Sequence, residues 1–314
     1  MNNTWGDVAQ YDPVTWNWII AIYLFMAGLS AGSLLIGLGL RWWSNTDDKS
    51  ESAILKAAAL IAPVAICIGL ACLVFDLTKP FHFWLILINY NFESVMAIGV
   101  AVLLFYIPLT FAYALMVLRD ELAQWKLGFL TPIATMLLPW RKPIELVMFV
   151  LALGVGAYTG FLLSAMNAYP MLNTAVLPAL FLVSGLSAGA AANTLVALLM
   201  FNSNGHEPHM KTMHGMELPV VFAEMTFIFM LFCALYFKGG AAAMALASLT
   251  TGVWAVVFWV GVVAIGFGIP LLSMLMPAHS RHTKGAMVTV ACASLAGVLA
   301  LRHFIIYAGQ SYIS

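Results

Sequence analysis

Charged side chains are scarce in this sequence, and that scarcity excludes a soluble fold. Only 8% of the 314 residues are Asp, Glu, Lys or Arg, whereas 63% are hydrophobic, and the mean hydropathy is +0.97. Apolar stretches long enough to cross a bilayer recur along almost the whole chain, which is typical of a polytopic helical membrane protein. The net charge is zero and the sequence contains no basic cluster, so nucleic acid is not expected as a partner.

Cysteine and histidine are too few and too dispersed for a resident metal cofactor. The four cysteines lie singly in apolar segments, without the C-x-x-C spacing of iron–sulfur or zinc sites. Of the seven histidines only His303 lies within an apolar span, whereas a membrane cytochrome b needs axial ligands from facing helices. We therefore expect no haem and no iron–sulfur cluster in this chain, and any electron carrier must bind reversibly.

Hydropathy predicts an all-α integral membrane fold with eight spans. The spans are expected near residues 17–41, 53–75, 93–118, 143–165, 174–200, 218–237, 249–275 and 286–308. The connections after odd-numbered spans carry most of the Lys and Arg, while those after even-numbered spans hold only Lys79 and Lys238. The positive-inside rule then places both termini on the side of the membrane that faces away from the cytoplasm.

The connection between the second and third spans is itself apolar but too short to cross the bilayer. It runs from Asp76 to Phe92, and Pro80 follows the end of the second span. We expect an interfacial helix on the outer face, with an ordinary connection of no functional role as the alternative.

A five-residue motif occurs twice, once in each half of the chain. Gly28-Leu-Ser-Ala-Gly32 in the first span recurs as Gly185-Leu-Ser-Ala-Gly189 in the fifth. This repeat favours two four-helix halves, at residues 1–170 and 171–314, related by an axis along the membrane normal. The alternative is that the small residues serve close helix packing alone.

The charges inside apolar runs are the best guide to function, because a charge at the bilayer centre costs roughly 2.5–3.5 kcal/mol on insertion scales. Such residues face a cavity, a partner or a proton path. They are Asp76, Glu93, Glu145, Glu217, Glu224 and Arg302. Glu93 and Glu145 begin spans and are expected to serve helix starts.

Four polar residues from four spans are expected at one depth in the outer half of the bilayer: Tyr23, Asp76, Tyr158 and Arg302. Together they suit a quinone, because two hydroxyls can bond the ring oxygens and a carboxylate can accept a quinol proton. An arginine nearby would keep that carboxylate ionised. The alternatives are interfacial anchoring for the tyrosines and snorkelling for the arginine.

Glu217 and Glu224 form a second candidate site. They lie seven residues apart near the start of the sixth span, hence on one helix face and about 10 Å apart along the axis. Spaced carboxylates entering a membrane suit a proton relay. For Glu217 the alternative is a helix-start acid favoured by the dipole, and for Glu224 it is a structural role.

Five stretches of the sequence resemble the polysulfide reductase membrane subunit family, which includes the NrfD proteins associated with nitrite reductase. They are residues 18–32, Phe75-Asp-Leu-Thr-Lys-Pro80, residues 154–164, Met216-Glu-Leu-Pro-Val220 and residues 302–310. The resemblance implies two four-helix bundles without haem, and menaquinol oxidation near the outer face. Electrons would pass to a periplasmic four-cluster ferredoxin-like iron–sulfur subunit and then to a catalytic subunit, often a molybdopterin enzyme.

The resemblance also assigns residues. It implies quinone binding for Tyr23 and Tyr158, and proton or charge roles for Asp76, Glu217, Glu224 and Arg302. The terminal acceptor is chosen by another polypeptide, so polysulfide and nitrite systems both stay open, and the general pattern leans toward polysulfide. A proton-coupled transporter or channel is the alternative from another class, but the polar groups are expected at one face rather than the midplane.

Overall fold

The computed structural model describes residues 16–44, 52–77, 80–82, 84, 94–203 and 207–310, and in these ranges it is entirely helical. The longer elements are α1 (Trp18–Ser44), α2 (Ala53–Asp76), α4 (Val95–Val117), α7 (Arg141–Ser164), α8 (Val176–Leu199), α9 (Pro208–Lys238) and α14 (Lys284–Gly309). The shorter ones are η2 (Pro80–His82), α5 (Arg119–Gln124), η3 (Gly128–Leu130), α6 (Thr131–Leu137), η4 (Leu138–Trp140), α10 (Gly240–Met244), η5 (Ala245–Leu249), α11 (Gly252–Val256), η6 (Val257–Gly268), α12 (Ile269–Met274) and α13 (Ala278–Arg281).

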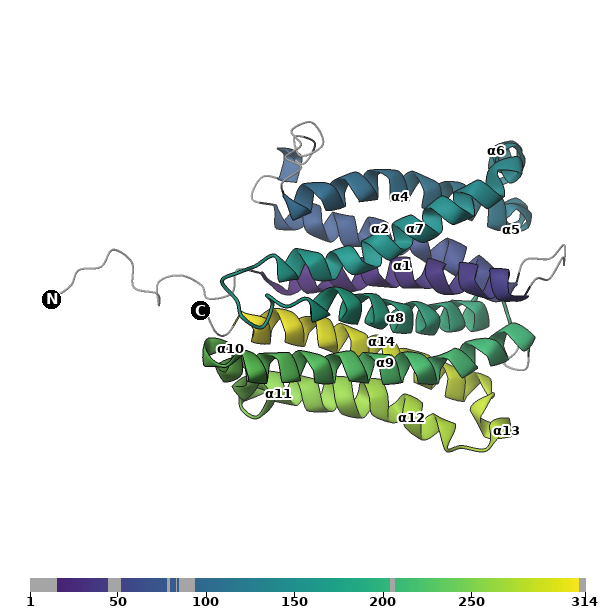
Figure 1. Cartoon of the computed structure of the whole chain (residues 1–314). Coiled ribbons are helices and arrows are strands. Elements are labelled where there is room, and N and C mark those ends of the chain that lie inside the picture. Colours follow the sequence, from purple (N-terminus) through teal and green to yellow (C-terminus); the bar gives the residue numbers. More distant parts are fainter. Residues whose placement is uncertain are drawn as a thin grey trace.

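Eight helical segments in the described ranges are long and apolar enough to cross a membrane, as the sequence predicts. The seventh is the continuous run from α11 through η6 to α12, and η6 is a π-helix. The spans run side by side, with α1 and α8 in the middle of the molecule (Figure 1). Helix α1 packs on α2, α7, α8 and α14, while α4 packs on α2 and α7 and closes a ring of four helices.

The two copies of the Gly-Leu-Ser-Ala-Gly motif pack directly on each other. A Cβ added to Gly32 would overlap the Gly185 carbonyl oxygen, at 1.9 Å, and one added to Gly189 would overlap the Gly32 carbonyl carbon, at 2.2 Å. Only glycine permits backbones to approach this closely. The packing role of the motif is therefore confirmed.

The sixth span begins ten residues earlier than hydropathy predicts. Helix α9 starts at Pro208, where a proline with its fixed φ is well placed in the first turn. A polar first part, residues 208–217, hides this start from a hydropathy window. Consequently Glu217 lies well inside the helix, and Glu224 is 14 residues, about 21 Å, from its far end at Lys238.

The two ends of the described part of the protein meet at one end of the molecule. The Trp16 amide donates to Gln310 Oε1 at 2.8 Å, across a sequence separation of 294 residues. The end of α2 and the start of α4 lie at this same end, which we call the Asp76 end (Figure 1). Of the predicted interfacial helix, Pro80–His82 form a short 3₁₀ turn and most of the rest lies outside the described residues.

Candidate functional site

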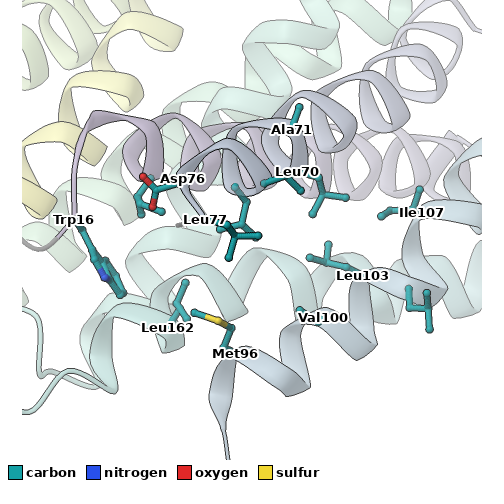
Figure 2. A pocket seen from close by; sticks show the side chains of 14 residues that line it. Trp16, Leu70, Ala71, Asp76, Leu77, Met96, Val100, Leu103, Ile107 and Leu162 are labelled. Carbon is teal, nitrogen blue, oxygen red and sulfur yellow. The ribbon is translucent and has the colours of Figure 1, made fainter. Parts of the chain in front are cut away.

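An elongated cavity of about 440 Å³ opens at the Asp76 end, between α1, α2, α4 and α7. Along α4 its wall runs from Met96 to Ile107, eleven residues or about 16 Å. Met96 is 46% exposed and Leu104 49%, so the cavity opens on the apolar flank of the helices. It is lined by Trp16, Ile20, Leu70, Ala71, Leu73, Val74, Asp76, Leu77, Met96, Val100, Leu103, Leu104, Ile107 and Leu162 (Figure 2).

Asp76 is the one charged side chain among these lining residues. It is the last residue of α2, and Figure 2 shows it beside Trp16 at one end of the cavity. Its Oδ1 accepts a hydrogen bond of 3.0 Å from Asn17 Nδ2. A long apolar chamber thus ends at a single carboxylate, which is the arrangement that orients an amphipathic molecule.

The two predicted tyrosines lie behind this cavity wall rather than on it. Tyr158 donates to the Met96 carbonyl at 3.5 Å, and its ring covers Gly99, where a Cβ would come within 1.8 Å of Tyr158 Cζ. Tyr23 is 1% exposed and lies on α1, which packs on α7, the helix that carries Tyr158. Tyr158 is connected to the cavity through Met96.

Arg302 is fully buried, and Glu224 is the carboxylate near enough for its charge to act on the guanidinium. Its Nη2 donates to the Phe181 carbonyl at 3.0 Å, and its Cζ lies 3.6 Å from the centroid of the Phe181 ring. Nε and Nη1 have no hydrogen-bond partner among the described residues. Glu224, 2% exposed, also interacts with the Ser187 hydroxyl. The two charges offset each other's burial cost in a site closed to the surface.

Glu217 lies at the edge of a much smaller cavity of about 10 Å³, which also touches Ser187. That volume suits about one water molecule. Glu217 Oε2 pairs with His214 Nδ1 at 2.9 Å. Ser187 thus lines the small cavity beside Glu217 and also interacts with Glu224.

Glu145 does more than favour a helix start. It is 3% exposed, in the second turn of α7, and accepts from Arg41 Nε at 3.1 Å and Arg141 Nε at 2.9 Å. Tyr113 also donates to it, at 3.4 Å. It joins α1, α4 and α7 at the end opposite Asp76. Glu93 lies outside the described residues.

A model of the family described as Polysulphide reductase, NrfD, matches residues 6–314. The chain belongs to this family. It is accordingly a multi-pass protein of the bacterial inner membrane, with eight helices able to span it.

Two relatives in the NrfD family match over almost their whole length. The protein is 46% identical to the C chain of polysulfide reductase from Wolinella succinogenes, with full coverage of both sequences. It is 39% identical to protein NrfD of Escherichia coli, with 96% of each covered. The C subunit of the selenate reductase from Mesobacillus selenatarsenatis is 27% identical, over 56% of this protein and 46% of its own length.

For this NrfD-family protein, the four residues predicted at one depth separate into two groups. Tyr23 and Tyr158 lie by the cavity that ends at Asp76, but Arg302 pairs with Glu224 instead of Asp76. Among the described residues, no contact therefore joins Arg302 to Asp76. The cause is geometric: α14 contacts α1 and α8, which carries Phe181, whereas Asp76 ends α2.

Sequence reasoning missed the polar residues that hold these groups in place, namely Asn17, Ser187 and Gln310. Asn17 stands just before the first apolar run, where an asparagine is a typical helix N-cap. Gln310 stands in a stretch that carries the family resemblance. Those two signals were available, whereas Ser187 looked only like part of a packing motif.

Proposed function

We propose that this protein is the membrane anchor and menaquinol-oxidising subunit of a periplasm-facing respiratory reductase complex of the polysulfide or sulfur reductase type. The observation that carries the proposal is the cavity of about 440 Å³ that is apolar along its length and has Asp76 at one end. Its volume lies in the range of about 300–1,000 Å³ usual for small-molecule sites. The apolar length suits an isoprenoid tail and the carboxylate suits a ring hydroxyl.

In this proposal each polar residue of the cavity has one role. Bound menaquinol supplies two electrons and two protons. Asp76 accepts one proton at its carboxylate, as a general base at the outer end of α2, and the second proton leaves to water at the outer face. Tyr158 turns from the Met96 carbonyl to hydrogen-bond a ring oxygen, and Tyr23 supports the hydroxyl of Tyr158 from behind. The apolar walls exclude water from the ring, which strengthens these interactions.

The electrons then leave this protein for partner subunits. We propose a periplasmic four-cluster ferredoxin-like iron–sulfur subunit as acceptor, feeding a molybdopterin-dependent catalytic subunit. Support comes from the polysulfide and selenate reductase relatives, each of which is named as one lettered component of a larger reductase. In the same arrangement both termini are periplasmic, and residues 1–170 and 171–314 each form a four-helix bundle.

A second polar path is proposed to connect the opposite face with the interior. Glu217, the small cavity, Ser187, Glu224 and Arg302 follow one another from the polar part of α9 inward. Each step is a carboxylate, a hydroxyl or room for a water, which are the groups that pass protons. Glu224 is then a relay group for protons between the cytoplasm and the quinol pocket.

The polysulfide type is favoured over the nitrite type by the identities of 46% to the polysulfide reductase relative and 39% to protein NrfD. A transporter is disfavoured by the shape of the two sites. The deep charges, Arg302 and Glu224, are sealed together, and the larger cavity is apolar. A transporter would place polar groups in an accessible midplane site.

The central experiment measures quinol-dependent turnover of the assembled complex with Tyr158→Phe and Asp76→Asn. Loss of one hydrogen bond of about 1 kcal/mol predicts a roughly fivefold fall for Tyr158→Phe. Loss of a general base predicts a fall of about 100-fold or more for Asp76→Asn. Reduction of the acceptor with an artificial donor to the catalytic subunit should stay unchanged.

Tyr236→Phe is the matched control, because Tyr236 is 68% exposed on α9 and remote from the cavity. Its quinol-dependent rate should equal that of the wild type. Wild-type rates in both Tyr158→Phe and Asp76→Asn would remove the quinol site from this cavity.

Orientation is tested separately with reporters fused after Ser314. A reporter active only in the periplasm should work, and one active only in the cytoplasm should be silent. A reporter fused between Leu199 and Pro208, in the connection before α9, should give the reverse pattern. Cytoplasmic activity at the C-terminus would overturn the periplasmic placement of the Asp76 end.

A further inference from the structure

The two residues ahead of α1 lie at one end of the large cavity, and the first of them lines it. Trp16 lines it, and Figure 2 shows the indole at the same end as Asp76, near Leu162 and Met96. The next residue, Asn17, precedes α1 and contacts Asp76 directly. Residues 16–17 thus connect the cavity wall to Asp76, the one carboxylate among the described residues that line it.

The orientation of the Asn17 amide is fixed by its two partners. The backbone N–H of Ile19 donates to Asn17 Oδ1 at 3.0 Å, as expected for the N-cap of α1. Only oxygen accepts such a bond, so Nδ2 must be the atom 3.0 Å from Asp76 Oδ1. One side chain therefore caps the first helix and donates to the last residue of the second.

The end of α14 holds this segment from the other side. Gln310 is 2% exposed, accepts from the Trp16 amide at 2.8 Å and donates to the Trp16 carbonyl at 3.0 Å. Its Nε2 also donates to the Ile306 carbonyl within α14. Both backbone groups of Trp16 are thereby satisfied by one buried side chain, which fixes the cavity wall to α14.

We propose that Asn17 is a positioning residue for Asp76, and that Gln310 fixes the wall against which the quinol ring lies. The proposal rests on the proposed function of the cavity. Asn17 occupies Oδ1 and orients the carboxylate, which leaves Oδ2 as the oxygen for a ring hydroxyl. Gln310 acts one step further away, through the backbone and indole of Trp16.

Substitutions of Asn17 and of Gln310 are expected to have different kinetic effects in the assembled complex. Asn17→Ser keeps a cap oxygen but replaces the amide that donates to Asp76 by a shorter hydroxyl, so kcat for quinol oxidation should fall about five- to tenfold with little change in KM. Gln310→Leu loosens the wall, so KM should rise severalfold while kcat changes less. The amount of protein in the membrane and the rate with an artificial donor should stay at wild-type levels in Asn17→Ser.

A double variant separates positioning from folding. Asn17→Asp combined with Asp76→Asn restores the hydrogen bond with donor and acceptor exchanged, while Asp also caps α1. Thermal stability should return to wild type, but kcat should stay as low as in Asp76→Asn because the carboxylate has moved. If Asn17→Ser does not accumulate in the membrane, the double variant is the test. Wild-type turnover in the double variant would overturn the proposal.

Failure of this proposal is distinct from failure of the quinol site. Wild-type kcat and KM in Asn17→Ser, together with loss of turnover in Asp76→Asn, would remove Asn17 alone. Wild-type turnover in Asp76→Asn itself would remove the quinol site. Equal changes of kcat and KM in Asn17→Ser and Gln310→Leu would reduce both residues to structural roles and overturn the assignment.

Discussion

The first and fifth spans carry the same Gly-Leu-Ser-Ala-Gly motif, but its serine has different partners in each. Ser30 donates to the Ala62 carbonyl at 2.8 Å and pairs with the Tyr106 hydroxyl at 2.9 Å. Ser187 instead interacts with the carboxylate of Glu224, which is paired with Arg302. The motif therefore sets how the helices pack, and the surrounding spans decide what chemistry lies beside it.

The cavities near the two serines also differ in volume. Beside the first four spans lies a cavity of about 440 Å³, and Leu103 and Ile107, on either side of Tyr106 in α4, line it. Beside Ser187 the space is about 10 Å³, enough for about one water. One part of the molecule thus has room for a ligand, and the other has a sealed charge pair with a short polar path.

The largest effect is expected where the two regions meet. In Gly32→Ala the new Cβ would lie 1.9 Å from the Gly185 carbonyl oxygen, and backbone on both sides prevents simple relief. Overpacking that side chains can absorb costs typically about 1–3 kcal/mol. Here two backbones would have to move apart, so the cost should exceed that of the variants that follow. We expect a marked loss of folded protein in the membrane and a lower thermal midpoint.

Gly39→Ala is the matched control in the same helix, because nothing lies within 4 Å of its added Cβ. Alanine favours a helix over glycine by about 0.8–1.0 kcal/mol in peptides, so this variant should be neutral or more stable. Equal stability of the two variants would contradict the close packing of α1 on α8.

The next effect separates the buried charge pair from the cavity. Arg302→Met leaves Glu224 buried without its cation, and breaking a buried pair costs about 3–5 kcal/mol in soluble proteins. Glu224→Gln should cost less, because Arg302 keeps the Phe181 carbonyl and ring. The double variant should recover much of the stability lost in Arg302→Met, as measured by thermal unfolding in detergent.

In reconstituted vesicles the assembled Glu224→Gln complex should show less proton uptake per turnover, because glutamine cannot ionise. The double variant should share this defect despite its recovered stability. Unchanged turnover and proton uptake in Glu224→Gln would leave Glu224 with a structural role, and the relay proposal would fail while the cavity proposal stands.

How far the sequence predicts this molecule depends on whether the signal is local. The eight spans follow from hydropathy, and the family follows from motifs such as Asp76-Leu-Thr-Lys-Pro80. A hydrogen bond between residues 294 positions apart, such as that between Trp16 and Gln310, produces no periodic pattern in the sequence. The proximity of Arg302 and Glu224 was missed because they lie 78 positions apart on different spans, and hydropathy does not indicate which spans pack together.

The smallest and most selective effect is expected at Gly99, which lies under the ring of Tyr158. In Gly99→Ala the Cβ would come within 1.8 Å of Cζ and 2.3 Å of the hydroxyl oxygen of Tyr158, so the ring must turn away from Met96. The displaced atoms belong to one side chain at the cavity wall, so helix packing should change little. Quinol-dependent turnover should fall about as far as in Tyr158→Phe, with normal amounts of protein in the membrane.

Gly154→Ala is the control, since its nearest contact is Val102 Cγ1 at an ordinary 3.9 Å. If Gly99→Ala and Gly154→Ala both retain wild-type turnover, the position of the Tyr158 hydroxyl is irrelevant to quinol oxidation, and the cavity must work through Asp76 without it.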